Sequence, residues 1–310
     1  MKIIDENTVH DLISMDESIE AMEWAFVQLS KGNSFVPQRT HLDIPDKNAS
    51  ALIMPAYVLE CPFYSVKLVS INYSNPHKGL PLIQAIVQVF DASTGEMIAS
   101  IDGNSITALR TAAASGLATK YLSKNDASIC AIFGTGVQAK AHISAMMSVR
   151  DINKFIIVGS SLTSAESFIQ SHNIDCQLEI GDVSSIGEAD IICTTTPSNQ
   201  PLFHYKHINK GCHINVIGSH TPDAREVSTQ TVIKSKVVVD SLEACQKEAG
   251  DLIIPEKDGV WSFDLVNGEL GHLVQRDVHG RETDNEITLF KSVGVAIQDL
   301  AMAKFIMEKL

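Results

Sequence analysis

The chain has 310 residues and is 45% hydrophobic, which is enough for two domains with sizeable cores. Its net charge of −13, from 24 basic and 37 acidic residues, argues against a nucleic-acid surface or an anionic membrane as partner. The first residues lack the apolar core of a signal peptide and no apolar run approaches a membrane span, so we expect a cytoplasmic protein.

The first 121 residues predict a mixed α+β segment that ends in a long helix. Helical apolar spacing follows Asp16, and Gly32-Asn33 ends it. Short strands separated by turns are then predicted over 51–54, 64–71, 82–90 and 97–101. Residues 107–121 are rich in Ala and Leu and predict one long helix, so a domain junction is expected near 112–125.

The stretch after this helix has the pattern of a phosphate-binding turn. A buried strand is predicted over 128–133, a tight turn at Gly134 and Gly136, and a helix over 137–149. The first glycine permits the turn, the second lets the backbone approach a pyrophosphate, and the small Ala139 allows close helix packing. The helix N-terminus offers free amides to phosphate. The pattern therefore predicts dinucleotide binding, with an ordinary strand-to-helix turn as the alternative.

Strands and helices alternate from this point to about residue 242. The candidate strands are 128–133, 154–158, 176–180, 190–195, 213–217 and 236–239. Six such strands with helices between them predict a doubly wound parallel sheet, the Rossmann arrangement. Residues 250–285 are less periodic, and 286–310 predict a last long helix with Ile287, Phe290 and Val293 on one face.

The cysteines and histidines show no metal or disulfide pattern. The six cysteines are scattered without a Cys-x-x-Cys pair, which predicts reduced core residues. The histidines form no cluster with ligand spacing, so we expect no metal.

Four segments together resemble one protein family. They are Ala-Leu-Arg-Thr-Ala-Ala at 108–113, Gly-Thr-Gly-Val-Gln-Ala at 134–139, Val-Ile-Gly-Ser-His at 216–220 and Glu-Ile-Thr-Leu-Phe-Lys-Ser-Val-Gly at 286–294. In order and spacing the chain resembles the ornithine cyclodeaminase/μ-crystallin family of NAD(P)-dependent proteins, and most closely its Δ1-pyrroline-2-carboxylate (ketimine) reductase branch. The resemblance implies a Rossmann domain over 115–285. It also implies an α+β substrate-binding and dimerisation domain formed by 1–114 with 286–310, and a homodimer.

The resemblance also assigns three cations to the carboxylate of a substrate. The matching positions are Arg39, Lys67 and Arg110. A guanidinium presents a planar fork to a carboxylate, and a local positive site suits a small anion in an acidic protein. The alternative for any one of them is a surface cation whose apolar stem is packed. Lys291 also lies in a family segment, but its helix is expected to serve packing and the dimer surface.

Residue 220 departs from the family pattern. Cyclodeaminases and related alanine dehydrogenases carry an aspartate there, whereas this chain has His220, with Asp223 three residues later. A neutral imidazole holds an ammonium group less well than a carboxylate does, but it suits hydrogen bonding or proton donation to an imine. We therefore expect His220 and Lys67 to be catalytic, and His220 and Asp223 to contact substrate. The alternative for His220 is a loop histidine that caps backbone groups.

Cofactor contacts are expected from several separate segments. The expected residues are Thr111, Gly134, Thr135, Gly136, Val137, Gln138, Ser160, Ser161, Thr195, Thr196, Pro197, Ile217, Gly218 and Ser219. The second strand ends at Gly159-Ser160-Ser161, where a strictly NAD-dependent enzyme usually has an acidic residue. We therefore expect NADPH to be favoured, with NADH also used.

These features favour a reductase of cyclic ketimine acids. The expected reaction converts Δ1-pyrroline-2-carboxylate to L-proline, with Δ1-piperideine-2-carboxylate to L-pipecolate as a second reaction, by hydride transfer to the C=N carbon. The enzymatic alternative is an ornithine cyclodeaminase or an L-alanine or other amino-acid dehydrogenase that uses Asp223. From another class, a non-catalytic NADPH-dependent small-ligand-binding protein remains open.

Overall fold

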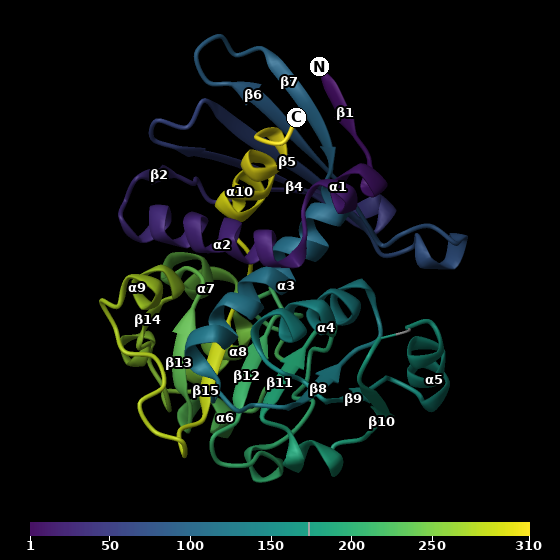
Figure 1. Cartoon of the computed structure of the whole chain (residues 1–310), viewed down its shortest axis with the longest axis vertical. Helices are drawn as coiled ribbons and strands as arrows, with labels where there is room; N and C mark the ends of the chain where they lie inside the picture. The colour runs from purple at the N-terminus through teal and green to yellow at the C-terminus, as the bar shows by residue number, and fades with distance from the viewer. Residues whose placement is uncertain (173) are drawn as a thin grey trace. The chain divides into compact units, whose positions relative to one another are not determined.

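The computed structural model describes residues 1–172 and 174–310, and they form two compact units. Unit 1 comprises Met1–Arg110 and Gly294–Leu310, and unit 2 comprises Thr111–Val293. The division falls inside helix α3 (Gly103–Leu122), near the middle of Figure 1, which begins in one unit and ends in the other. The expected combination of an α+β part with a parallel α/β part is confirmed.

Unit 1 is built on a seven-stranded sheet of order β1-β7-β6-β5-β4-β2, with β3 paired to β4. Strand β1 runs parallel to β7, and the other pairs are antiparallel. The strands are β1 (Lys2–Ile4), β2 (Ser34–Phe35), β3 (Thr40–Ile44), β4 (Ala49–Val58), β5 (Phe63–Asn72), β6 (Ile83–Asp91) and β7 (Met97–Asp102).

Three helices belong wholly to unit 1: α1 (Glu6–Leu12), α2 (Met15–Ser30) and α10 (Ala296–Met307). Helix α2 begins with a capping box, because Ser14 and Glu17 each accept a hydrogen bond from the backbone N–H of the other. Helix α10 contacts α2 and strands β4 and β5, and it is buried along most of its length (Figure 1). The C-terminal helix therefore covers one face of the antiparallel sheet.

Side chains of the central strands alternate between a covered and an open face. Met54 of β4 pairs in register with Lys67 of β5, and both side chains are buried. Ile53, Leu68 and Ile86 pair in register on the opposite face and are 38%, 44% and 36% exposed. The covered face thus carries a buried lysine, and the open face carries an apolar row.

Unit 2 contains an eight-stranded, all-parallel sheet of order β10-β9-β8-β11-β12-β15-β13-β14. The strands are β8 (Ile129–Phe133), β9 (Lys154–Val158), β10 (Gln177–Ile180), β11 (Ile191–Thr194), β12 (His213–Val216), β13 (Lys236–Val239), β14 (Gly268–Glu269) and β15 (Thr288–Lys291). The order reverses direction at β8, as in a Rossmann fold, so β8 and β11 flank the switch point.

Helices connect and cover these strands. They are α4 (Val137–Val149), α5 (Leu162–Gln170), α6 (Thr229–Ile233), α7 (Leu242–Glu248), α8 (Gly250–Lys257) and α9 (Leu270–Gln275). The predicted bounds of β9, β13 and α4 are confirmed. Within the described residues, no helix combines the length and the apolar character needed to cross a bilayer.

The prediction of one helix over 286–310 is wrong. Residues Thr288–Lys291 form β15, which lies between β12 and β13, and helix α10 begins only at Ala296. Ile287, Phe290 and Val293 recur at helical spacing, but a short run of buried residues fits a central parallel strand equally well. Gly294, at φ +80°, separates the strand from the helix.

A buried histidine joins helix α4 to helix α3 within unit 2. Nε2 of His142 lies 2.9 Å from Oγ of Ser115, and Nδ1 lies 2.8 Å from the carbonyl oxygen of Gln138. Complete burial lowers the pKa of His142 from 6.5 to about 4, so the imidazole is neutral at pH 7. In the neutral ring, the Nδ1–H therefore donates to the carbonyl oxygen of Gln138, and Nε2 accepts from the hydroxyl of Ser115.

We expect this histidine to make the protein sensitive to acid. As the pH falls from 6.5 towards 4, the unfolded chain binds a proton that folded His142 does not. Its contribution to the free energy of unfolding therefore falls by about 3 kcal/mol over that window. Urea unfolding at pH 7 and pH 4.5 measures the decline, which should be smaller in His142→Gln. His10→Gln, on the exposed surface of α1, is the control. Equal declines in wild type and His142→Gln would contradict this assignment.

Candidate active site

Unit 1 brings two of the three predicted cations, Lys67 and Arg110, to one buried carboxylate, and the charge of Arg39 acts on Lys67. Nζ of Lys67, on β5, lies 2.9 Å from Oδ1 of Asp299, on α10, and donates to Oγ1 of Thr107 at 2.5 Å. Nε of Arg110, on α3, lies 3.6 Å from the same Asp299 oxygen. Arg39 donates to the carbonyl oxygen of Gly294. We call Arg39, Lys67, Arg110 and Asp299 the cation cluster.

The cluster carries more positive than negative charge, and this affects Lys67. Burial, together with the charges of Arg110 and Arg39, outweighs the opposing effect of Asp299 and lowers the pKa of Lys67 from 10.5 to about 8. Lys67 is therefore protonated at pH 7 but titrates within reach of ordinary assays. A small anion placed here would meet several donors at once.

Two residues of α10 belong to this region although the sequence did not predict them as site residues. Oδ2 of Asp299 and Nε2 of Gln298 are buried, and neither has a hydrogen-bond partner among the described residues. The oxygen of Gln298 accepts from Arg110 at 3.2 Å and from the backbone N–H of Val295 at 2.9 Å. The sequence pattern of α10 predicts a helix that serves packing, so it did not identify Gln298 and Asp299 as site residues.

In unit 2, the predicted glycine turn meets the loop after β11. Gly134 has φ +114°, and a Cβ there would lie 2.6 Å from Oγ1 of Thr195. Thr195 donates to the carbonyl oxygen of Phe133 from both its backbone nitrogen and its hydroxyl, at 2.9 and 2.8 Å. Gly136 is the N-cap of α4 and faces open space, and Val137 is 70% exposed. A phosphate therefore has room to approach the helix N-terminus.

The loops after β11 and β12 also touch each other. Ile217 N donates to the carbonyl oxygen of Thr194 at 3.1 Å. A Cβ on Gly218 would lie 2.1 Å from the carbonyl oxygen of Thr196, so only glycine fits. Ser219 is buried and its hydroxyl donates to the carbonyl oxygen of Ala224 at 2.7 Å.

Further predicted residues differ in their environment. Gln138 is partly buried next to the glycine turn, and Thr111 is buried in α3. Pro197 is exposed in the loop after β11. His220 and Asp223 are exposed in the loop that follows β12 in unit 2, whereas Lys67 belongs to unit 1.

The sequence did not predict two buried acidic residues of unit 2. Glu226 accepts hydrogen bonds from the loops after both β11 and β12. Asp251 lies 2.8 Å from Nζ of Lys291, which is on β15 and not on a helix surface as predicted. Their partners are scattered along the sequence, so no local motif revealed them.

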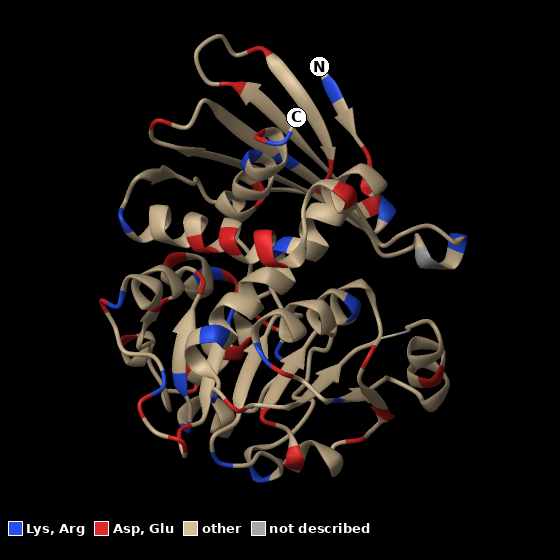
Figure 2. Cartoon of the chain, in the orientation of Figure 1, with Lys and Arg blue, Asp and Glu red and all other residues tan. Residues whose placement is uncertain are grey.

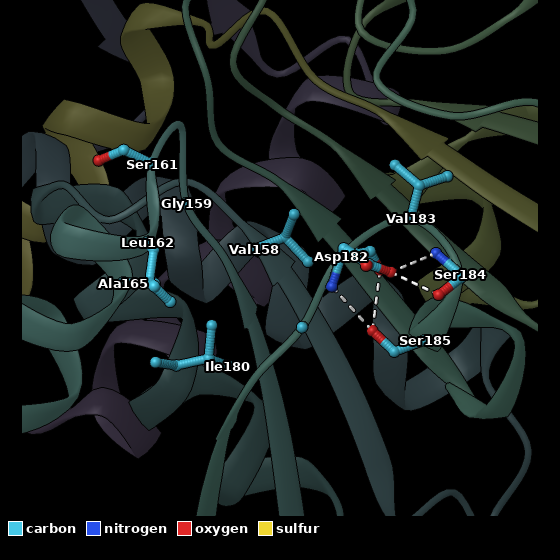
Figure 3. Close-up of a pocket in the computed structure, with 11 residues that line it drawn as sticks. Val158, Gly159, Ser161, Leu162, Ala165, Ile180, Asp182, Val183, Ser184 and Ser185 are labelled. Carbon is cyan, nitrogen blue, oxygen red and sulfur yellow. Dashed lines mark hydrogen bonds between the residues drawn. The ribbon is translucent and has the colours of Figure 1, made fainter.

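An open hollow of about 530 Å³ lies at the carboxyl ends of β9 and β10 (Figure 3). Ser161 and Leu162 border one side, and Asp182 the other. The Asp182 carboxylate accepts from the backbone N–H and the hydroxyl of Ser184, at 2.7 and 2.6 Å. The hollow, the glycine turn and the switch point together fit an extended dinucleotide.

The side chains that could bind a metal ion are dispersed in the part of the chain that the structure describes. Across residues 1–172 and 174–310, no group of three His, Cys, Asp or Glu side chains is placed to hold a metal ion. All six cysteines are free thiols.

The chain has full-length relatives of known family. The sequence profile of the ornithine cyclodeaminase/mu-crystallin family matches residues 2–310. A Δ(1)-pyrroline-2-carboxylate reductase of Bacillus cereus is 36% identical over 314 residues, which cover 100% of this chain and 96% of the relative.

Two solved structures extend the similarity to the fold. The Thermococcus litoralis Δ(1)-pyrroline-2-carboxylate reductase in complex with NADH and L-proline superposes with a TM-score of 0.95 at 39% identity, over 100% of this chain and 97% of that one. An archaeal alanine dehydrogenase dimer with bound NAD gives 0.92 at 31%, over 100% and 95%. The chain therefore belongs to the ornithine cyclodeaminase/mu-crystallin family, whose members are NAD(P)-dependent oxidoreductases that act on imine or amino groups.

Proposed function

We propose that this protein reduces cyclic ketimine carboxylates with NAD(P)H. Its main substrate is Δ1-pyrroline-2-carboxylate, which it converts to L-proline, and the six-membered Δ1-piperideine-2-carboxylate is a second substrate. The cation cluster of unit 1 is the observation that carries the proposal, because an acidic protein of charge −13 has gathered Lys67 and Arg110 at the Asp299 carboxylate, and the charge of Arg39 also acts on Lys67. The names of the relatives at 36% and 39% identity support the same substrate class.

In this proposal, Arg110, Lys67 and Arg39 hold the substrate carboxylate and orient the ring. The unpaired, buried Nε2 of Gln298 offers a further donor. A nicotinamide, when bound, supplies the hydride that goes to the C=N carbon. The nitrogen needs one proton to complete the reduction, and His220 provides it or hydrogen-bonds the protonated imine.

The cofactor preference depends on two opposing features. The segment Gly159-Ser160-Ser161 after β9 has no carboxylate to repel a 2′-phosphate, which favours NADPH. Asp182 is the charged residue among those that line the neighbouring hollow, and hydrogen bonds to Ser184 lower the pKa of its carboxyl group. A negative charge there opposes a 2′-phosphate, so NADPH is favoured only modestly and NADH is also used.

The first test is a spectrophotometric assay of cofactor oxidation with Δ1-pyrroline-2-carboxylate. We expect rapid turnover with NADPH, slower turnover with NADH, and none in the reverse test with L-ornithine plus NAD. Proline formed from ornithine would support the cyclodeaminase, and pyruvate formed from L-alanine plus NAD would support an alanine dehydrogenase. Tight binding of cofactor without turnover of any imine would instead support a ligand-binding protein. Each of these three results would overturn the proposed function.

The pH dependence of the reaction tests Lys67. Because its pKa is about 8, the ammonium that holds the substrate carboxylate is lost above that pH, and kcat/KM should fall there. Lys67→Met should lower kcat/KM on the order of 10- to 100-fold and remove this alkaline limb. Asp299→Asn should move the limb to lower pH, because the Asp299 charge raises the pKa of Lys67. Lys47→Met, on the exposed surface of unit 1, is the control. An unchanged limb in Lys67→Met would contradict the assignment.

The open face of the sheet in unit 1 supports assembly into a homodimer. Strands β4 to β7 carry at most one charged residue each, so most of their length is tan in Figure 2. Ile53, Leu68 and Ile86 form an exposed row, and the rings of Tyr64 and Phe90 stack at 4.9 Å. Contiguous apolar surface of this kind marks an interaction site. The proposed occupant is a second copy of the chain, since the archaeal alanine dehydrogenase relative is a dimer.

Light scattering after size-exclusion chromatography tests the dimer. The double variant Leu68→Glu/Ile86→Glu should elute as a monomer, because two carboxylates per chain would be buried at the interface. Leu265→Glu changes a residue of unit 2 that is 64% exposed and should leave the dimer intact. A monomeric wild type, or a dimer that survives the double change, would refute this interface.

A further inference from the structure

Glu226 is a completely buried carboxylate that receives five hydrogen bonds, one from the last residue of β11 and four from two loops. Its Oε1 accepts from the backbone N–H and the hydroxyl of Thr196, at 2.8 and 2.7 Å. Its Oε2 accepts from the hydroxyl of Thr194 at 2.8 Å and from the backbone N–H of Gly218 at 2.7 Å and Ser219 at 3.3 Å. One side chain therefore connects the loop after β11 with the loop after β12.

A second carboxylate fixes Glu226 itself. Oδ1 of Asp251, in the first turn of α8, accepts from the backbone N–H groups of Glu226 and Val227 at 2.7 and 3.0 Å. Oδ2 of Asp251 lies 2.8 Å from Nζ of Lys291, which also donates to the carbonyl oxygen of Ser219 at 2.6 Å. The loop that carries His220 and Asp223 is consequently held at both its ends, near 218–219 and near 226–227.

This arrangement is costly, and its location points to a role beyond packing. The side chains of Glu226, Asp251 and Lys291 are all out of contact with water. Because desolvating a charge costs free energy, a buried ion pair contributes little to stability. Burial and the Asp251 charge raise the pKa of Glu226, while Lys291 and the donors from Thr196 oppose that shift. These buried charged groups lie at the carboxyl edge of the parallel sheet, where ligands of such sheets bind.

We propose that Glu226 is a positioning residue for the cofactor: its carboxylate holds the loops after β11 and β12 in the one arrangement that lets both contact a bound dinucleotide. This inference rests on the proposed function, which assigns Thr195, Thr196, Pro197, Ile217, Gly218 and Ser219 to cofactor binding. Glu226 acts through these loops and does not touch the reacting atoms.

The Glu226→Gln substitution tests the hydrogen bonds of Glu226 with little change in side-chain volume. Both carboxylate oxygens only accept hydrogen bonds, and each faces at least one backbone N–H. In Glu226→Gln, either orientation of the amide turns an NH₂ donor against the donors of one loop. The variant keeps the volume of the side chain but leaves one loop without its acceptor.

The experiment titrates NADPH and NADH by fluorescence into the full-length protein, without substrate. Glu226→Gln should weaken the Kd of both cofactors about tenfold or more and lower kcat, while KM for the imine changes little. Asp190→Asn is the matched control, because Asp190 also accepts two backbone N–H groups, from Ser128 and Ile129 at 3.0 and 3.2 Å, but at the opposite edge of the sheet. It should lose thermal stability and keep the wild-type Kd.

The remaining outcomes are also decisive. If Glu226→Gln does not fold, Thr194→Val removes one donor to Glu226 with little change of shape, and a several-fold weaker Kd would support the proposal. A wild-type Kd in the variant that folds, or an equal weakening in Asp190→Asn, would overturn it. Because the titration needs no imine, failure to turn over any imine refutes the proposed function without touching this inference.

Discussion

Charged groups that lose contact with water have to be satisfied by the protein itself, and each unit is organised around one such set. In unit 1, Lys67 and Asp299 form an ion pair in which both side chains are only 1% exposed. In unit 2, Lys291 and Asp251 form a fully buried ion pair, and the backbone N–H of Glu226 donates a hydrogen bond to Asp251. Removing one member would leave the other as a buried charge without its partner, which is strongly destabilising. Each set therefore holds together elements that are distant in sequence.

Sequence patterns predicted the fold well where the signal was local. Helix α4 and strands β9 and β13 have the predicted bounds, because glycines, caps and apolar runs mark their ends. Strand β15 could not be recognised in this way. Its four residues are buried between β12 and β13, and the spacing of Ile287, Phe290 and Val293 also fits a buried helix.

The candidate site was less accessible to sequence reasoning than the fold. Family motifs pointed to Lys67, Arg110 and the glycine turn, since these lie in compact segments. Asp299 was not predicted because its partner Lys67 is 232 positions away and α10 looks like a packing helix. Glu226 was not predicted because its role depends on Thr194, Gly218 and other groups that meet only in the folded sheet.

The place of β15 in the sheet has a consequence for synthesis on the ribosome. Strands β12 and β13 are complete by residue 239, but the slot between them is filled only by residues 288–291. Unit 1 similarly waits for α10, at 296–307, to cover its sheet. A nascent chain that ends before residue 288 therefore exposes two unpaired strand edges and an uncovered apolar face. Such surfaces aggregate readily, so both units depend on the last part of translation being followed promptly by folding.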